Sequence, residues 1–305
     1  MKKKVFLFGL LFSLLLLCGC GVNLTSTVKL NKDFSGTRVM SCTFSSRDFH
    51  SYFKGSKEDL NKLIKESCPD ALTYTSSSSD GNDTYTFYLR FSSLDDYKKK
   101  VRDLLNFSPE ITYEYGDSPF VSGLIYKENF TSKDLMTWLY TALYEGKYID
   151  KDSSSDLWDL KSTEISFLGT TYETKDKINI DEMAYVPLSS IHIDTKTKKS
   201  GKLARVIEFD LPQQTLDQNA GKIRSYFAGN DITWENTSDG KTLCISFDAN
   251  NFSDLAQKTR TVLHSKNSFG TYSSTCSKDN PFTLKINYEE SLDLSHFIQK
   301  NQKIP

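Results

Sequence analysis

The chain has 305 residues, of which 38% are apolar and 13% aromatic. Disordered chains are poor in aromatic residues, so this composition excludes a mostly disordered protein, and the length allows one large domain or two domains of about 150 residues each. The formal net charge of -1 excludes a strongly basic nucleic-acid-binding protein on bulk electrostatics.

The first 20 residues have the pattern of an export signal. Three lysines after Met1 precede an apolar run from Val5 to Cys18. This run is shorter than the roughly 20 apolar residues that a spanning helix needs, and it is typical of a secretory signal peptide. Gly19 and Cys20 close the run, in an order that resembles the lipobox of bacterial lipoproteins.

The resemblance to bacterial lipoproteins implies a location for the chain. It implies that residues 1–19 are a signal peptide, and that Cys20 becomes the first mature residue and carries a diacylglyceryl group. Two acyl chains hold a protein stably at a membrane, so we expect an exported protein anchored at the outer face of the bacterial cytoplasmic membrane. The alternatives are an ordinary cleaved signal and a short spanning anchor.

The start of the mature chain has a further similarity. A strand followed by Asp33-Phe34-Ser35-Gly36-Thr37 resembles LppM-type bacterial lipoproteins, which are exported α+β proteins. The resemblance covers only the beginning of the mature chain, and it implies binding of a lipid or glycolipid rather than catalysis.

Residues 20–145 are expected to form a first α+β domain. Segments 28–30 and 37–44 alternate in polarity around a polar turn and predict a β-hairpin, as do segments 72–74 and 84–91 around an Asp-Gly pair. Helices are predicted in between, over residues 57–67 and from Leu94, and another β-hairpin and a last helix follow. In the helix from Leu94, an apolar stripe recurs at helical spacing and a capping serine lies just before it.

The last predicted helix of this domain, over residues 132–145, has two apolar stripes. Beside an ordinary core stripe lie Met136, Tyr140 and Tyr144, at offsets of four residues. We favour packing of this second stripe between the two halves of the chain. The alternative is that Met136, Tyr140 and Tyr144 form an exposed patch that binds a glycan, a lipid or a protein.

Residues 146–183 are predicted to be a linker with possible extra strands. The segment begins with a polar run and continues with two strand-like stretches, 164–171 and 177–180. Neither stretch has a counterpart in the other half of the chain.

Residues 184–305 are expected to form a second domain that repeats the first. Hairpins are predicted at 191–209 and 232–247, and helices at 216–227 and from Phe252. Matching positions in the two halves are separated by 158 to 163 residues. We therefore predict an α+β protein with two duplicated β-β-α-β-β-α-β-β-α units, whose antiparallel sheets carry helices packed on one face.

Four cysteines remain after Cys20. An exported location permits disulfides, and Cys42 with Cys68 and Cys244 with Cys276 would each pair within one half. A buried free thiol is an equally natural interpretation of Cys42, because it shares a strand face with apolar residues.

The sequence contains no recognisable catalytic set. Its four histidines are far apart, and no zinc-protease, hydrolase or phosphate-binding motif is present. We expect no catalytic residues, no metal site, no cofactor, no enzyme activity and no nucleic-acid partner. The predicted role is non-catalytic binding or scaffolding at the cell envelope, with an envelope protein, a glycan or a lipid as ligand. The alternatives are a lipid- or glycolipid-binding lipoprotein and a structural subunit of a membrane complex.

Overall fold

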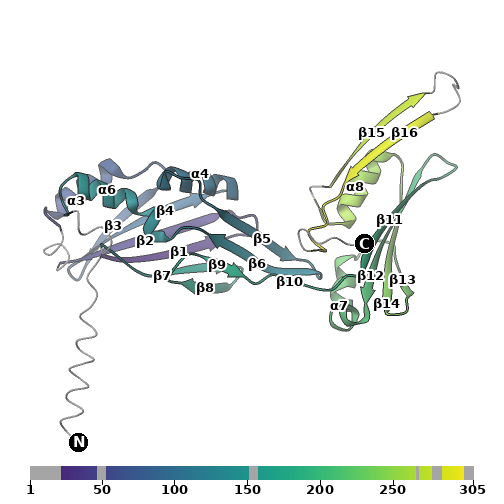
Figure 1. The fold of residues 1–305 in the computed structure, drawn as a ribbon, viewed down its shortest axis with the longest axis horizontal. Coiled ribbons are helices and arrows are strands. Elements are labelled where there is room, and N and C mark those ends of the chain that lie inside the picture. Colours follow the sequence, from purple (N-terminus) through teal and green to yellow (C-terminus); the bar gives the residue numbers. More distant parts are fainter. Residues whose placement is uncertain (1–21, 47–52, 151–156, 266–267, 277–283, 299–305) are drawn as a thin grey trace, which may run out of the picture. The chain divides into compact units, whose positions relative to one another are not determined.

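The chain folds into two compact units of mixed α and β structure (Figure 1). A computed structural model describes residues 22–46, 53–150, 157–265, 268–276 and 284–298. The first unit contains the chain up to Glu114 and residues 125–181, and the second contains residues 115–124 and the chain from Glu182 onward. The predicted signal peptide and the predicted lipidation site, Cys20, lie outside the described residues. Among the described helices, none has the length and apolar character of a membrane-spanning segment.

The first unit is built on a six-stranded sheet in the order β3-β4-β2-β1-β7-β8 (Figure 1). Its strands are β1 (Val22–Leu30), β2 (Gly36–Ser45), β3 (Thr73–Ser79), β4 (Asn82–Phe91), β7 (Trp158–Phe167) and β8 (Thr170–Thr174). All neighbours pair antiparallel except β1 and β7, which are parallel. The sheet is therefore mixed, in contrast to the purely antiparallel sheet that the hairpin signals predicted.

The helices of the first unit lie along one side of this sheet (Figure 1). They are α3 (Lys57–Ser67), α4 (Leu94–Leu105), α5 (Ser132–Leu135) and α6 (Thr137–Glu145). The side chains of Ser56 and Ser93 cap the first turns of α3 and α4. The single helix predicted over residues 132–145 is two helices, because the backbone leaves helical geometry at Met136, with φ -99° and ψ 7°.

A β-hairpin of β5 (Ile111–Asp117) and β6 (Val121–Glu128) contributes to both units. Its tip, residues 115–124, is counted with the second unit. Strand β6 also pairs with β9 (Asn179–Asp181) and with β10 (Ala184–Tyr185).

The segment predicted as a linker, 146–183, has a different role in the structure. From it come β7 and β8, which extend the large sheet of the first unit, and β9, which pairs with β6. The predicted extra strands are therefore present, and backbone hydrogen bonding makes them part of the first unit.

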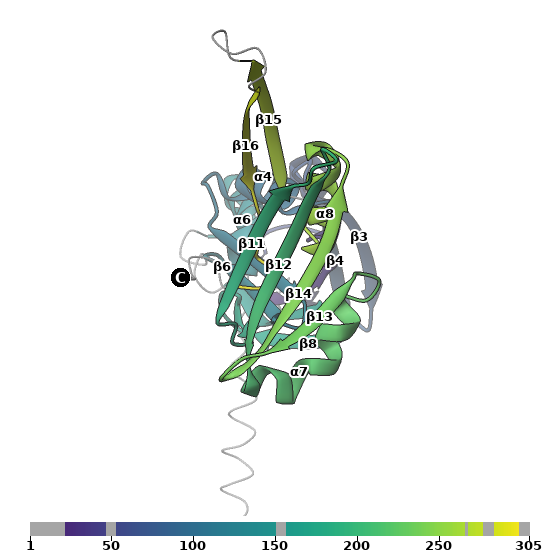
Figure 2. The same cartoon turned by 90° about the vertical axis from the view of Figure 1, so that its right-hand side faces the viewer.

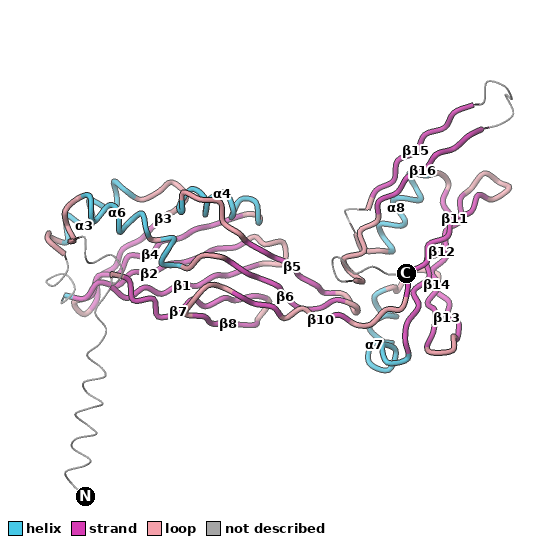
Figure 3. Tube along the Cα trace, viewed as in Figure 1, coloured by secondary structure: helices cyan, strands magenta, loops and turns pink. Residues whose placement is uncertain are grey.

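The second unit has a four-stranded antiparallel sheet in the order β11-β12-β14-β13 (Figure 2). Its strands are β11 (Ser190–Thr197), β12 (Leu203–Pro212), β13 (Ile232–Asn236) and β14 (Gly240–Ala249). Helices α7 (Gln213–Tyr226) and α8 (Phe252–Val262) pack against β12 and β14. A separate two-stranded sheet follows, of β15 (Phe269–Cys276) and β16 (Leu284–Ser291) (Figure 3).

Two helix predictions differ from the structure in the second unit. Helix α7 begins at Gln213, three residues before the predicted start at Leu216. The prediction missed Gln213, Gln214 and Thr215 because these residues are polar and do not extend the apolar periodicity. The helix expected after β16 is not found in the described residues, where 292–298 form irregular structure and turns.

The two units arrange four of their strands in the same order. In each, the neighbours along the sheet are the first, second, fourth and third strands, as β1-β2-β4-β3 and as β11-β12-β14-β13. A helix follows the second strand and another follows the fourth in both units. The elements of the two units thus correspond one to one over this part of the chain.

The described cysteines are free thiols. Cys42 is fully buried and Cys68 is half-buried, and neither forms a disulfide. Burial raises the pKa of the Cys42 thiol, which makes it inert. Cys244 is free as well, and the side chain of Cys276 lies outside the described residues.

Candidate functional site

The predicted patch of Met136, Tyr140 and Tyr144 is only partly at the surface. Met136 lies at the break between α5 and α6, and its side chain is 0% exposed. It therefore cannot contact a ligand at the surface. Tyr140 is half-buried and Tyr144 is 40% exposed. Their rings are parallel, with centroids 6.4 Å apart. The patch is thus reduced to two stacked tyrosines.

The apolar face of α6 is covered within the first unit. Leu139 and Leu143 are fully buried, and α6 packs against α3 and α4. The rings of Trp138 and Phe87 of the sheet pack edge to face, with a centroid distance of 5.4 Å. This face is the ordinary core stripe of the helix, and it is buried within the unit to which α6 belongs. Packing of Tyr140 and Tyr144 between the two halves of the chain stays a prediction.

An open groove lies between α3, the end of α4 and α6. Its volume is about 690 Å³. Apolar side chains of Leu63, Phe107, Trp138 and Ala142 form much of its lining, and Phe107 is 48% exposed. Asn106 adopts a left-handed conformation with φ 57°, which ends α4 just before Phe107. Tyr140 and Tyr144 are on the adjacent face of α6 and do not line the groove.

The rim of this groove is acidic. Asp103, Asp134 and Glu145 line it, and its described lining contains no lysine or arginine. Asp134 is engaged in the cap of α5, where it accepts hydrogen bonds from the backbone N–H and the hydroxyl of Thr131 at 2.7 and 2.9 Å. Asp103 and Glu145 are exposed and remain directed to solvent. The groove thus combines an apolar floor with negative charge.

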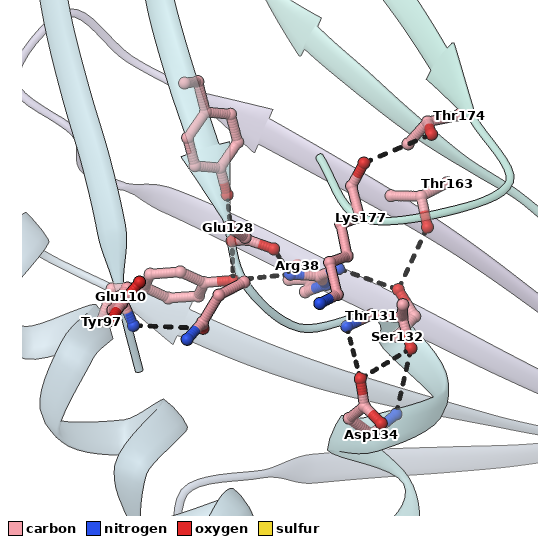
Figure 4. Close-up of polar contacts among 12 residues, drawn as sticks. Arg38, Tyr97, Glu110, Glu128, Thr131, Ser132, Asp134, Thr163, Thr174 and Lys177 are labelled. Atoms are coloured by element: carbon pink, nitrogen blue, oxygen red, sulfur yellow. Dashed lines mark hydrogen bonds and ion pairs between the residues drawn. The ribbon is translucent and has the colours of Figure 1, made fainter. Parts of the chain in front are cut away.

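A second polar cluster, around Arg38, is entirely buried in the first unit (Figure 4). Arg38 donates hydrogen bonds to Glu128 at 2.7 Å, to the Tyr97 hydroxyl at 2.7 Å and to Ser132 at 2.8 Å. Tyr97 and Tyr126 in turn donate to Glu128. These residues come from β2, α4, β6 and α5, so the cluster joins four elements.

The electrostatics of the Arg38 cluster are those of a closed structural site. Burial by itself lowers the pKa of Arg38, but the charge of Glu128 outweighs it and raises the pKa above its usual value. Burial raises the pKa of Tyr97 and of Tyr126. Arg38 and Glu128 have side chains that are 1% and 0% exposed. No solvent-borne substrate can reach them in this conformation, so we interpret the cluster as a structural one that joins four elements of the fold.

The second unit has a similar cluster around Arg205. Arg205 donates to Glu290 and to Thr259, both at 2.7 Å, and Tyr288 donates to Glu290 at 2.9 Å. This cluster is less enclosed, because the side chain of Glu290 is 13% exposed.

The alternation of buried and less buried residues along β2 is a sequence signal that identifies Arg38 as a buried charge. It shares the inward face of β2 with Met40, Cys42 and Phe44. Glu128 likewise shares the buried face of β6 with Tyr126. A charged residue in phase with buried apolar positions indicates a buried ion pair, although the sequence does not identify its partner.

The comparisons with known proteins do not assign a family. No protein-family model matches the chain, and no curated protein matches it. Among the described residues, no three or more histidine, cysteine, aspartate or glutamate side chains are grouped so that they could hold a metal ion.

Proposed function

We propose that the chain is an exported, membrane-anchored lipoprotein that binds a partner at the cell envelope without catalysis. The groove between α3, α4 and α6 is the observation that carries the binding role, because it is open, apolar at its floor and acidic at its rim. The lipobox-like order of Gly19 and Cys20 supports the anchor.

The two units are, in this proposal, copies of one ancestral unit. Their shared strand order supports duplication. The matching clusters around Arg38 and Arg205 also support duplication. In each, an arginine of the second strand pairs with a glutamate that also accepts a hydrogen bond from a tyrosine hydroxyl. Their members are Arg38, Tyr126 and Glu128 in the first unit and Arg205, Tyr288 and Glu290 in the second. A third match is Lys100 and Lys258. Each donates to the backbone carbonyl of the penultimate residue of the preceding strand, Arg90 in β4 and Asp248 in β14, at 2.8 Å in both cases.

The chemistry of the groove indicates the kind of partner that it binds. Its carboxylates attract positive charge, and its apolar floor needs apolar side chains to cover it. A basic amphipathic segment of a partner protein supplies both. We therefore assign such a segment to the groove, with its lysines or arginines near Asp103 and Glu145 and its apolar residues over Phe107 and Trp138.

Binding in the groove can be tested with a synthetic helical peptide of leucines and lysines in isothermal titration calorimetry. Replacing Asp103 by Asn and Glu145 by Gln together is expected to weaken binding about three- to tenfold, since each exposed charge pair contributes up to about 1 kcal/mol. The matched control replaces Asp95 and Glu58, which are acids of α4 and α3 that do not line the groove. Equal effects of the two double variants would contradict the assignment.

The anchor is tested by replacing Cys20 with serine. Serine cannot form the thioether to the lipid, so the variant protein is expected to move from the detergent phase to the aqueous phase in a detergent phase partition. The unchanged chain, expressed in the same bacterial host, serves as control. Persistence of the variant in the detergent phase would show that the apolar N-terminal segment holds the protein in the membrane without lipidation.

A further inference from the structure

The end of the β11–β12 hairpin in the second unit is exposed and rich in lysine. Strands β11 and β12 pair antiparallel from Ser190 to the turn (Figure 2). All residues of the stretch 194–202 are exposed. We call residues 196–202 the lysine tip, because they contain no acid and four lysines, Lys196, Lys198, Lys199 and Lys202.

The first unit has the same backbone turn between β1 and β2. In that turn, the Asn31 N–H donates to the Ser35 carbonyl at 2.9 Å. In the second unit, the Lys198 N–H donates to the Lys202 carbonyl at 2.7 Å. Asn31 therefore corresponds to Lys198, and Ser35 corresponds to Lys202.

Apolar side chains hold this end of the hairpin in the core of the first unit but not of the second. Three side chains are buried in the first unit, those of Val28, Leu30 and Phe34. The corresponding residues of the second unit are small and exposed, and they are Thr195, Thr197 and Gly201. A Cβ atom added to Gly201 would meet no atom within 4 Å. The lysine tip is therefore not fixed by burial of its own side chains.

The two turns also differ in charge. The turn of the first unit contains one cation, Lys32, and one acid, Asp33, so its side chains have no net charge. The corresponding five residues of the second unit, 198–202, contain three lysines and no acid. The same backbone turn thus has a concentrated positive charge in the second unit only.

The acids near the lysine tip leave most of this charge available. Lys196 pairs with Asp194 at 2.8 Å, and Lys198 pairs with Asp248 at 2.6 Å. All four of these side chains are at least 46% exposed, and exposed ion pairs are weak. The other two lysines of the tip form no ion pair within the part of the chain that the structure describes.

We propose that the lysine tip contacts the phosphate headgroups of an anionic membrane. Its charge is complementary to anionic phospholipid, which attracts clusters of lysine close to a membrane surface. The lysines are spread along an exposed hairpin end rather than gathered in an enclosed site, which suits a continuous anionic surface better than a single small anion. The inference rests on the proposed membrane anchor, which keeps the chain close to such a surface.

The test uses the full chain, purified from the membranes of a bacterial host and reconstituted into vesicles. One set of vesicles is phosphatidylcholine alone, and the other contains phosphatidylglycerol as well. The rate at which a water-soluble reagent acetylates each lysine is measured by mass spectrometry. In the anionic vesicles the lysines of the tip are expected to react about three- to tenfold more slowly, because headgroups pair with their ammonium groups. High salt is expected to restore the rates.

Three exposed lysines in the helices of the first unit are the internal standards: Lys62, Lys65 and Lys99. They are expected to react at equal rates in the two kinds of vesicle. Equal slowing of these lysines and of the tip would mean that the whole protein adsorbs to the anionic surface, and it would contradict a specific role of the tip.

A triple variant tests whether the charge of the tip causes the contact. Replacing Lys198, Lys199 and Lys202 by Gln is expected to return Lys196 to the rate that it has in phosphatidylcholine vesicles. The matched control replaces the three internal standards by Gln. It removes the same charge from the chain but is expected to leave Lys196 slowed in the anionic vesicles. All six positions are exposed, so both variants are expected to fold.

Two further results would overturn the proposal. They are equal rates for the tip lysines in the two kinds of vesicle, and continued slowing of Lys196 in the triple variant of the tip. Sodium polyphosphate, added to the phosphatidylcholine vesicles, provides the remaining comparison. If it slows the tip lysines more than phosphatidylglycerol does, the tip binds a soluble polyanion and the membrane assignment is wrong.

Failure of the anchor and failure of the tip give different results. Phosphatidylcholine vesicles have no net charge, so retention of the chain on them depends on the anchor and not on the lysines. A chain that is released from these vesicles contradicts the anchor, and the rates at the tip are still measured with phosphatidylglycerol present. Neither measurement involves the groove of the first unit.

Discussion

Replacing Glu128 by alanine is expected to lower the free energy of unfolding of the first unit by about 3–5 kcal/mol, because it leaves a buried arginine without its counter-charge. Arg38 is 1% exposed, and Glu128 is its only ion-pair partner among the described residues. Urea unfolding gives the change in free energy. Hydrogen exchange of the β2 amides localises that change to the first unit.

The second unit provides a matched control for this prediction. Glu290→Ala removes the corresponding carboxylate, but that side chain is 13% exposed, so water can hydrate Arg205 and the loss is expected to be smaller. The double variant Arg38→Met with Glu128→Leu removes both charges and is expected to recover most of the stability. A loss below about 1 kcal/mol for Glu128→Ala would mean that the pair behaves as an exposed one.

Phe120→Ala is expected to destabilise the second unit by about 3–5 kcal/mol, the usual cost of removing a buried aromatic ring. Phe120 is 0% exposed, and its ring centroid is 5.3 Å from that of Phe297 and 6.2 Å from that of Phe209. Thermal unfolding followed by near-ultraviolet circular dichroism measures the loss. Hydrogen exchange of β12 shows whether it occurs in the second unit.

Phe107→Ala is the control for Phe120→Ala. It removes the same ring from a site that is 48% exposed, so it is expected to change stability little. A loss in Phe120→Ala as small as that in Phe107→Ala would contradict the placement of Phe120 in the core of the second unit. Protection of the β2 amides is expected to remain unchanged in Phe120→Ala.

Local features of the fold were predictable because their signals lie within a few residues. Helix α3 occupies the predicted residues 57–67, and Ser56 caps it through a box with Asp59. The turn around Asp80 and Gly81 joins β3 to β4, with positive φ at both residues. The mixed α+β class follows from such elements. Met136 was misjudged because helical periodicity continues through a break that the sequence does not mark.

The sequence by itself determined most of the elements, their polar and apolar faces and the chemical character of the N-terminal segment, because each depends on neighbouring residues and on periodicity. Only the tertiary structure decided that β7 lies parallel to β1, that the tip of the β5–β6 hairpin is counted with the second unit, and that Arg38 meets Glu128 across 90 residues of chain. Such contacts join distant segments, and they depend on how whole faces pack together.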